Sequence, residues 1–328
     1  MNDSVDPSTL PPVALLQLLY GGQATQLAYV MAKLNLADLL KDGPKRSDEL
    51  ARATQTDPAA LRRVLRGLTT MGLCSEVAGE QFALSRMGKY LRTDRPDSLQ
   101  PRALFNGEVL FALWGELLRT VQTGQSAQER VYGLSLYDYF AEHAEVGALF
   151  DRAMASYTRY RLSAAVRAYD FSPFGTIVDV GGGTGALLIQ ILQAYPQPHG
   201  VVFDLPTVAE RATEQIRAAG LADRCTAVGG NALERVPPGG DAYIVCNVVN
   251  GMDDGTARKV LQSCRAAMAK NGRLLLPEWV MSAGGQTAED FAFWDTAWID
   301  LTLLVAFGSR HGGVRTETEF RRLLAASG

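Results

Sequence analysis

The stretch from Thr176 to Gly185, which reads T-I-V-D-V-G-G-G-T-G, constrains the fold of this chain more than any other. Its β-branched start predicts a strand, and the apolar pattern from Ala186 to Leu192 predicts a helix directly after it. The glycines between them permit a tight turn and a close approach of the backbone to a ligand, and the helix N-terminus offers free N–H groups. A doubly wound sheet begins its nucleotide site in this way, so we predict an α/β fold.

Two acids near this turn discriminate between classes of cofactor. Asp179 lies two residues before the first glycine, and Asp204 ends a second predicted strand, at 200–203, where an acid holds ribose hydroxyls. The glycines also satisfy the dinucleotide pattern G-x-G-x-x-A, but a carboxylate at the strand tip repels a pyrophosphate. S-adenosylmethionine carries an ammonium and a sulfonium and no phosphate. The pattern therefore favours S-adenosylmethionine, and the remaining alternative is a purely structural turn.

The doubly wound pattern continues downstream with predicted strands at 225–228, 242–246 and 273–276. Predicted helices at 208–219 and 257–268 precede the first and the last of these strands. Ligands of such sheets bind at the carboxyl ends of the strands. The polar residues at those ends are therefore the first candidates for a site: Asp204, Asn231, residues 247–250 and Glu278.

The first hundred residues follow the order of a winged helix. Ser47 is predicted to be the N-cap of a helix over 48–53, and Asp57–Pro58 is predicted to start a second helix. Two short strands are predicted at 73–77 and 81–84. Such a module invites a DNA-binding hypothesis, but acids and bases nearly balance there and form no basic stripe. The long apolar N-terminal stretch instead predicts pairing with a second copy, and hence a homodimer.

Charge and composition narrow the partners further. The net charge of −3 gives no electrostatic case for nucleic acid or an anionic membrane, and no apolar run reaches membrane-spanning length. The start, Met1–Pro7, is acidic and polar, unlike a signal peptide. The four cysteines lack the spacing of a zinc site or a disulfide framework. We expect no metal and a cytoplasmic setting.

Residues 101–168 are again helical and rich in large side chains, most of which we expect in the core and some around a pocket for a flat, apolar substrate. The sequence thus predicts three parts: a helical winged-helix dimerisation domain at 1–100, linking helices of the substrate pocket at 101–168, and a cofactor-binding Rossmann-like domain at 169–328.

Nearly the whole chain resembles the small-molecule O-methyltransferase family that has an N-terminal winged-helix dimerisation domain and acts in natural-product pathways, including antibiotic biosynthesis. The motifs that carry the resemblance are V-D-V-G-G-G-T-G at 178–185, F-D-L-P at 203–206, G-N-A-L-E-R-V-P at 230–237, L-L-L-P-E at 274–278 and R-T-E-T-E-F at 315–320.

The resemblance implies an S-adenosylmethionine-dependent methyltransferase of aromatic or polyketide-like secondary metabolites. For cofactor binding it points to Asp179, Gly181, Gly183, Gly185, Asp204, Leu205, Asn231, Ala232 and Asn247. For substrate binding it points to Met154, Tyr157, Asn250, Asp300 and Leu303.

The sequence departs from this family where catalysis takes place. The family's base is a histidine after the fourth strand, and Asn250 occupies that position. A neutral amide cannot accept a proton. Glu278 matches one of the two acids that support the histidine, but the position of the second acid is Val314. His311, in a glycine-rich loop, is a candidate replacement base, so the catalytic candidates are Asn250, Glu278 and His311.

These departures leave several functions open. The first is methyl transfer to nitrogen, carbon or an acidic oxygen, with positioning supplying much of the rate. The second is an enzyme that binds S-adenosylmethionine but performs hydroxylation, decarboxylation or cyclisation. A catalytically silent binding protein and a winged-helix DNA-binding regulator come last. We predict methyl transfer.

The sequence stops at Ser327–Gly328, before the two strands that complete the sheet in the family. Either those two strands lie beyond this sequence, or the sheet is short.

Overall fold

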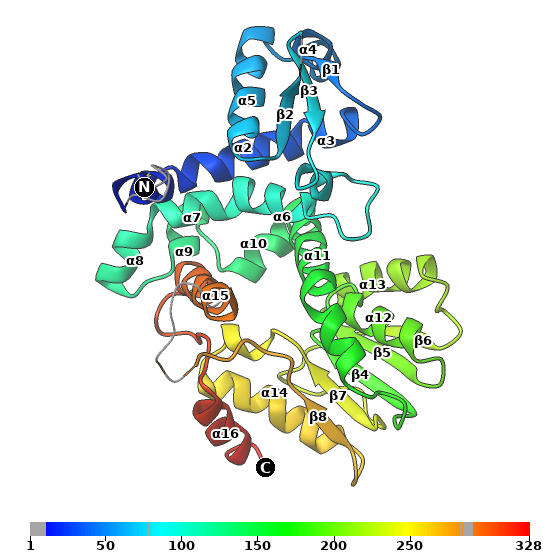
Figure 1. Ribbon diagram of the computed structural model, residues 1–328. Coiled ribbons are helices and arrows are strands. Elements are labelled where there is room, and N and C mark those ends of the chain that lie inside the picture. Colours follow the sequence, from blue (N-terminus) through cyan, green and yellow to red (C-terminus); the bar gives the residue numbers. More distant parts are fainter. Residues whose placement is uncertain (1–10, 78, 283, 285–290) are drawn as a thin grey trace, which may run out of the picture. The chain divides into compact units, whose positions relative to one another are not determined.

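The computed structural model describes residues 11–77, 79–282, 284 and 291–328, so the predictions made for Met1–Pro7 lie outside the described residues. The chain divides into two compact units, one up to Phe111 and one from Ala112 onward (Figure 1). The three-part division at residues 100 and 168 stays a prediction.

The first unit is helical with a small antiparallel sheet. Its sheet has the order β1-β3-β2, built from β1 (Lys45–Arg46), β2 (Cys74–Val77) and β3 (Gln81–Leu84). Its helices are α1 (Pro11–Leu19), α2 (Gly21–Lys33), α3 (Leu36–Leu39), α4 (Ser47–Thr54), α5 (Pro58–Thr70) and α6 (Gln100–Phe105), followed by a π-helical turn at Asn106–Leu110.

The two predicted helix starts in this unit had different outcomes. Asp57 caps α5 as predicted, because its Oδ1 accepts the N–H of Ala60 at 2.7 Å. Ser47 is instead the first helical residue of α4, and Arg46 is in the cap position. The carboxylate of Glu49 accepts the N–H of Arg46 at 3.2 Å, so the acid in the first turn ties down the helix start without a serine cap.

The second unit contains a parallel sheet with the order β6-β5-β4-β7-β8. The strands are β4 (Thr176–Val180), β5 (His199–Asp204), β6 (Cys225–Gly229), β7 (Ala242–Val245) and β8 (Arg273–Leu275). The helices α11 (Ala144–Ala168), α12 (Ala186–Ala194) and α13 (Pro206–Ala218) lie on one side of it, and α14 (Asp254–Ala267) and α16 (Glu317–Ala325) lie on the other. This is the α/β class that the glycine-rich stretch predicts.

The side chains of β4 point alternately into two hydrophobic cores, one on each face of the parallel sheet. Ile177 points into the core under α11–α13, whereas Val178 and Val180 point into the core under α14 and α16. Successive side chains of a strand point to opposite faces, so Asp179 falls on the face of Ile177, although it is an acid. A strand that is apolar except for one acid indicates a functional position.

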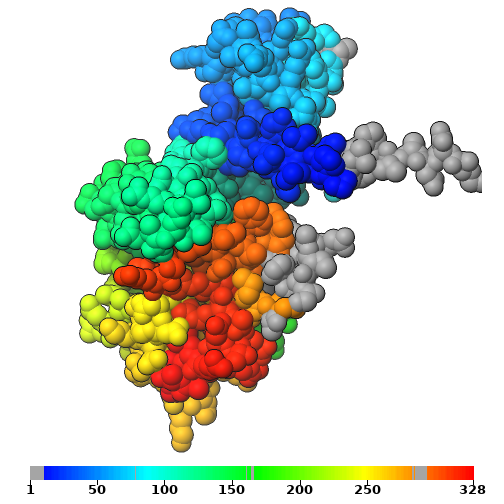
Figure 2. All heavy atoms as spheres, turned by 90° about the vertical axis from the view of Figure 1, so that its left-hand side faces the viewer, coloured from blue at the N-terminus to red at the C-terminus, as the bar shows by residue number. Residues whose placement is uncertain are grey.

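Five more helices complete this unit: α7 (Phe111–Gly115), which starts at the last residue of the first unit, α8 (Leu117–Thr123), α9 (Ala127–Tyr132), α10 (Leu136–Glu142) and α15 (Phe291–Phe307). Figure 2 shows the orange atoms of α15 between the green atoms of α8–α10 and the red atoms of α16. Ser126 joins two of these helices, because its hydroxyl caps α9 and donates to the carbonyl of Ala306 at 2.7 Å. No helix within the described ranges is long and apolar enough to cross a bilayer.

Candidate active site

The carboxyl ends of three central strands bring the predicted site residues to one edge of the sheet. Val180 of β4 is paired with Phe203 of β5 and with Val245 of β7. The glycine-rich turn, Asp204 and the segment 247–250 therefore leave the sheet side by side.

The glycine-rich turn is fastened to β5 by three hydrogen bonds, one of which runs from the N–H of Gly182 to the carbonyl of Phe203 at 3.3 Å. The N–H of Gly181 donates to the carbonyl of Phe203 at 2.7 Å, and the N–H of Gly183 donates to Oδ2 of Asp204 at 2.8 Å. Gly181 has a φ of 69°, and a Cβ there would lie 2.5 Å from Cγ2 of Val248, so only glycine fits against the segment that follows β7. At Gly183, with a φ of 57°, a Cβ would meet nothing within 4 Å, so the backbone faces open space there.

Asp179 is a buried carboxylate that forms no hydrogen bond within the described part of the chain. It is 1% exposed, and neither of its side-chain oxygens has a hydrogen-bond partner among the described residues. Burial, with a smaller contribution from the charge of Asp204, raises the pKa of Asp179 to about 7. Because a buried unpaired acid is costly, its presence calls for a partner of opposite charge, and the ammonium and sulfonium of S-adenosylmethionine are groups of that kind.

Asp204 combines two structural hydrogen bonds with capacity for more. Its carboxylate accepts the N–H of Gly183 through Oδ2 and the N–H of Leu205 through Oδ1, at 2.8 and 2.7 Å. Burial raises its pKa, and these two N–H groups oppose the rise. Each oxygen keeps a second lone pair, so the fixed carboxylate suits the vicinal hydroxyls of a ribose.

Asn231 follows β6 and forms a local turn, since its Oδ1 accepts the N–H of Leu233 at 3.0 Å. Asn231 is exposed, and Ala232 packs partly buried on the core. Leu205 follows Asp204, and Leu233 lies two residues after Asn231. These two large apolar side chains are 46% and 41% exposed. Exposed apolar side chains beside hydrogen-bonding groups fit a flat heterocycle. The residues present thus fit S-adenosylmethionine.

The structure brings together two of the three catalytic candidates, Asn250 and Glu278. Asn250 lies in the 3₁₀ turn Val249–Gly251 after β7 and is 2% exposed, and Glu278 follows β8. The Nδ2 of Asn250 donates to Oε2 of Glu278 at 2.6 Å, whereas its Oδ1 is buried without a hydrogen-bond partner among the described residues. The amide is therefore oriented by the acid, with its acceptor atom left free for another group.

Glu278 also holds the backbone that precedes Asn250. Its Oε1 accepts the N–H groups of Val248 and Val249 at 3.0 and 3.1 Å. Asn247 has a φ of 56°, a left-handed conformation that asparagine tolerates and that starts this turn. Burial raises the pKa of Glu278 to about 7, against the effect of these N–H groups and of the Arg315 charge.

His311, the third catalytic candidate, is exposed, and its Nδ1 lies 2.8 Å from the carbonyl oxygen of Phe307. Its imidazole thus interacts with the last residue of α15. Asp300, in the middle of α15, accepts the N–H of Val314 at 2.7 Å and so fastens the loop that carries His311. Met154 on α11 and Leu303 on α15 are partly buried.

Tyr157 leads to an acid that the sequence reasoning missed. Its hydroxyl donates to the carboxylate of Asp295 at 2.8 Å, and the same carboxylate pairs with Arg161 at 2.6 Å and accepts the indole N–H of Trp279 at 3.4 Å. Trp279 directly follows Glu278, so Asp295 joins α11 and α15 to the catalytic segment. An acid within the apolar sequence of α15 was the available signal.

Comparison with protein families gives two matches. Residues 16–94 match the O-methyltransferase dimerisation domain, and residues 114–328 match the O-methyltransferase domain.

Three curated relatives are similar over nearly the full chain. Phenazine O-methyltransferase PhzM of Lysobacter antibioticus is 40% identical over 96% of this chain and 89% of its own length. Mitomycin biosynthesis 6-O-methyltransferase of Streptomyces lavendulae is 32% identical, over 95% and 87%. The 8-amino-8-demethylriboflavin N,N-dimethyltransferase of Streptomyces davaonensis is 34% identical, over 92% and 85%.

Two solved structures give the same result. The crystal structure of LaPhzM has a TM-score of 0.91 at 39% identity and covers 97% of this chain and 94% of its own. The O-methyltransferase NcsB1 from neocarzinostatin biosynthesis, in complex with S-adenosylmethionine and 2-hydroxy-5-methyl naphthoic acid, has a TM-score of 0.78 at 28% identity, over 95% and 92%. The comparisons give no support to a non-methylating enzyme or a DNA-binding regulator.

Proposed function

Since this chain belongs to the O-methyltransferase family, and is thus an S-adenosylmethionine-dependent enzyme of the methyltransferase class, we propose that it methylates an aromatic amine of secondary metabolism. The observation that carries the choice of acceptor is the orientation of Asn250. Its Nδ2 is committed to Glu278, so its free Oδ1 accepts a hydrogen from the nucleophile. An N–H group supplies that hydrogen, whereas a phenolate has none and is repelled by the amide oxygen.

The residues of the site divide the work of the reaction. Asp179 and the glycine-rich turn would hold the cationic end of the cofactor, and Asp204 would hold its ribose. When bound, S-adenosylmethionine would supply a methyl group on a positively charged sulfur, and the lone pair of the substrate nitrogen would bond to the methyl carbon in line with the departing sulfur. Asn250 directs the N–H of the substrate so that the nitrogen lone pair faces the reacting carbon. The nitrogen loses its proton after the new bond forms, so Asn250 need not act as a base.

A phenol is the second candidate acceptor, because the phenazine relative is named an O-methyltransferase. A neutral phenol also donates a hydrogen to Oδ1 of Asn250. Glu278 lies behind the amide and not at its free oxygen, which leaves the phenol without a base in direct contact. We therefore rank the amine first.

A substrate that carries both groups tests this choice directly. We expect 3-amino-4-hydroxybenzoate and related aminophenols, incubated with methyl-labelled S-adenosylmethionine, to give S-adenosylhomocysteine one-for-one with N-methylated product. We expect at least about a tenfold preference in kcat/KM for nitrogen over oxygen, the value of about one hydrogen bond, which an N–H group forms with Oδ1 of Asn250 and a reactive phenolate cannot. Mass spectrometry of the product locates the label. Predominant O-methylation would refute the amine proposal, and conversion without S-adenosylhomocysteine would refute methyl transfer.

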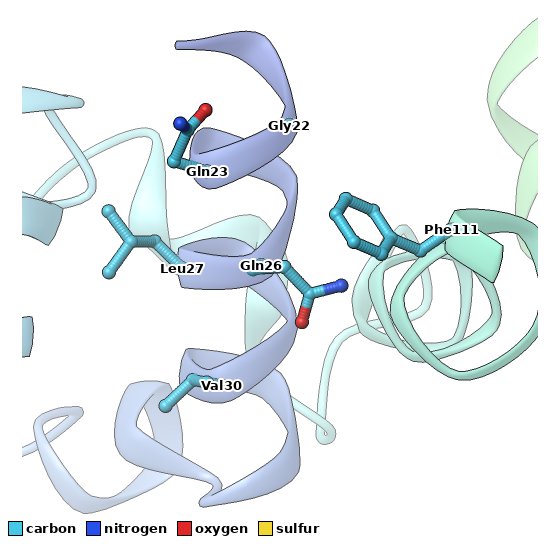
Figure 3. Close-up of a pocket in the computed structure, with 6 residues that line it drawn as sticks. All are labelled: Gly22, Gln23, Gln26, Leu27, Val30 and Phe111. Atoms are coloured by element: carbon cyan, nitrogen blue, oxygen red, sulfur yellow. The ribbon is translucent and has the colours of Figure 1, made fainter. Parts of the chain in front are cut away.

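The dimerisation domain supports a homodimer, and we propose that the second copy covers α1 and α2. Leu15, Leu16, Leu18 and Leu19 of α1 are 56%, 50%, 76% and 66% exposed. A groove of about 500 Å³ on α2 is lined by Gly22, Gln23, Gln26, Leu27, Val30 and Phe111 (Figure 3). Exposed apolar surface of this kind marks a protein interface. The cytoplasmic setting predicted from the sequence is likewise a proposal.

Replacing Leu18 with aspartate is expected to weaken dimerisation roughly 30-fold, because one buried leucine contributes about 2 kcal/mol at an interface. Sedimentation equilibrium measures the change. The control is Leu324→Asp, which places the same charge at a 37% exposed leucine at the end of α16. An unchanged dimer in the Leu18 variant would place the interface elsewhere.

A further inference from the structure

Arg315 is a buried guanidinium whose hydrogen bonds reach the catalytic turn. It is 7% exposed and stands just before α16. Its Nη1 donates to the carbonyl of Val249 at 2.7 Å, and its Nη2 donates to the carbonyl of Met252 at 2.6 Å. Nε and Nη2 also donate to Oδ1 of Asp254, at 3.1 and 2.9 Å. The planar fork thus spans both ends of the turn that contains Asn250.

Glu278 holds the opposite set of groups in the same turn. It accepts the N–H groups of Val248 and Val249, while Arg315 donates to the carbonyls of Val249 and Met252. The turn's own backbone bond, from the N–H of Met252 to the carbonyl of Val249, is 3.2 Å long. A three-residue 3₁₀ turn has little stability of its own, so these two side chains fix its conformation.

The backbone of Arg315 is itself anchored. Its carbonyl accepts the N–H of Met281 at 2.9 Å, and the N–H of the preceding Val314 donates to Asp300 at 2.7 Å. The preceding loop also lies directly on the turn, because a Cβ at Gly312 would collide with the carbonyl oxygens of Asn250 and Met252. These contacts therefore hold the backbone of Arg315 in place.

We propose that Arg315 is a positioning residue of the reaction: its guanidinium holds the Val249–Met252 turn so that Asn250 stays oriented by Glu278 towards the methyl acceptor. The inference rests on the proposed role of Asn250. Arg315 contacts neither substrate nor cofactor in this role and acts through the turn.

The charge of Arg315 adds a second, separable effect. It lowers the pKa of Glu278, opposing the rise that burial causes. The thiol of Cys246 also interacts with Glu278, and burial raises the pKa of that thiol. Without the guanidinium, Glu278 is expected to become protonated at a higher pH. A protonated Glu278 no longer selects the orientation of Asn250 that leaves Oδ1 free.

Two substitutions separate the effect of the hydrogen bonds of the Arg315 guanidinium from the effect of its charge. We expect Arg315→Met to lower kcat about 10- to 30-fold. KM and the Kd of the cofactor are expected to change less than threefold. The acidic limb of the kcat–pH profile is expected to move to higher pH. Arg315→Lys keeps the charge but not the two-pronged geometry, so we expect it to lower kcat less and to leave the limb in place. Arg321→Met is the matched control, since Arg321 is an exposed arginine paired within α16.

Hydrogen–deuterium exchange gives a readout without turnover. We expect the amides of residues 248–253 to exchange faster in Arg315→Met, while those of β4 keep the wild-type rate. If exchange and the pH limb are unchanged and only the melting temperature falls, the positioning role is refuted. If wild-type protein forms no S-adenosylhomocysteine, the proposed function fails, while the exchange result still decides whether Arg315 holds the turn.

Discussion

Replacing Asp179 with asparagine is expected to weaken S-adenosylmethionine binding about 100-fold and, at pH 8, to make the cofactor-free protein more stable. The first effect follows from our proposal that this buried carboxylate holds the cationic end of the cofactor, an interaction of roughly 3 kcal/mol. The second follows because that carboxylate is 1% exposed and has no hydrogen-bond partner among the described residues. One substitution thus improves folding and damages binding.

The gain in stability depends on pH in a defined direction. The pKa of Asp179 in the folded protein is about 7, above its ordinary value of 3.8. The folded state therefore binds this proton more tightly than the unfolded state, and stability is lost as the pH rises from about 4 through 7. The advantage of asparagine is expected to be of order 2 kcal/mol at pH 8, after its own unsatisfied amide is allowed for, and to disappear near pH 4.

Calorimetric titration with S-adenosylmethionine and urea unfolding between pH 4 and 8 measure the two effects. We also expect the wild-type affinity to fall below pH 7, where Asp179 becomes protonated, and the variant to show no such dependence. Asp223→Asn, at an exposed acid of the same unit, serves as the control. Wild-type affinity in the Asp179 variant would show that this acid does not serve the cofactor.

Replacing Glu278 with glutamine is expected to lower kcat by roughly 100- to 1,000-fold, in the range found for removing one preorganised polar group from a catalytic site. The carboxylate accepts three donors, the N–H groups of Val248 and Val249 and Nδ2 of Asn250. A glutamine amide has one oxygen for these donors and brings an NH₂ group that faces one of them. Asn250 then loses the partner that fixes its orientation.

The pH profile and a double-mutant cycle test whether Glu278 acts through Asn250. The pKa of Glu278 is about 7, so its ionised form predominates only above that pH. Wild-type kcat is therefore expected to fall as the pH drops through 7. This dependence of kcat on pH is expected to vanish in Glu278→Gln. Combining Glu278→Gln with Asn250→Ala is expected to cost little more than the larger single effect. Full additivity would mean that the two residues act independently.

The cofactor half of the site was predictable because its determinants are local. A strand with one acid, four glycines and a helix start are close together in the sequence, and three of those glycines, Gly181, Gly183 and Gly185, adopt positive φ in the turn. The cap at Asp57 is predictable for the same reason. At Ser47 the local rule was wrong by one residue, because Glu49 offered the helix start a competing acceptor.

The catalytic half depended on contacts between distant residues. Glu278 meets Asn250 across 28 positions because β7 and β8 are neighbours in the sheet, and Arg315 reaches Val249 across 66. Asp295 and Tyr157, 138 positions apart, meet through the packing of α15 and α11. No periodicity or turn signal encodes such pairings, because they depend on the order of strands and on the packing of side chains.

The sequence by itself therefore determined the α/β fold, the conformation of the glycine-rich turn and the presence of Asn250 where the resemblance predicts a histidine, since these lie in residue identity and local pattern. Only the tertiary structure decided which end of the Asn250 amide has no partner among the described residues, that Asp179 is buried without one there, and which buried charges contact the Val249–Met252 turn. Burial and hydrogen-bond geometry fix these properties, and both arise only when segments far apart in the chain pack together.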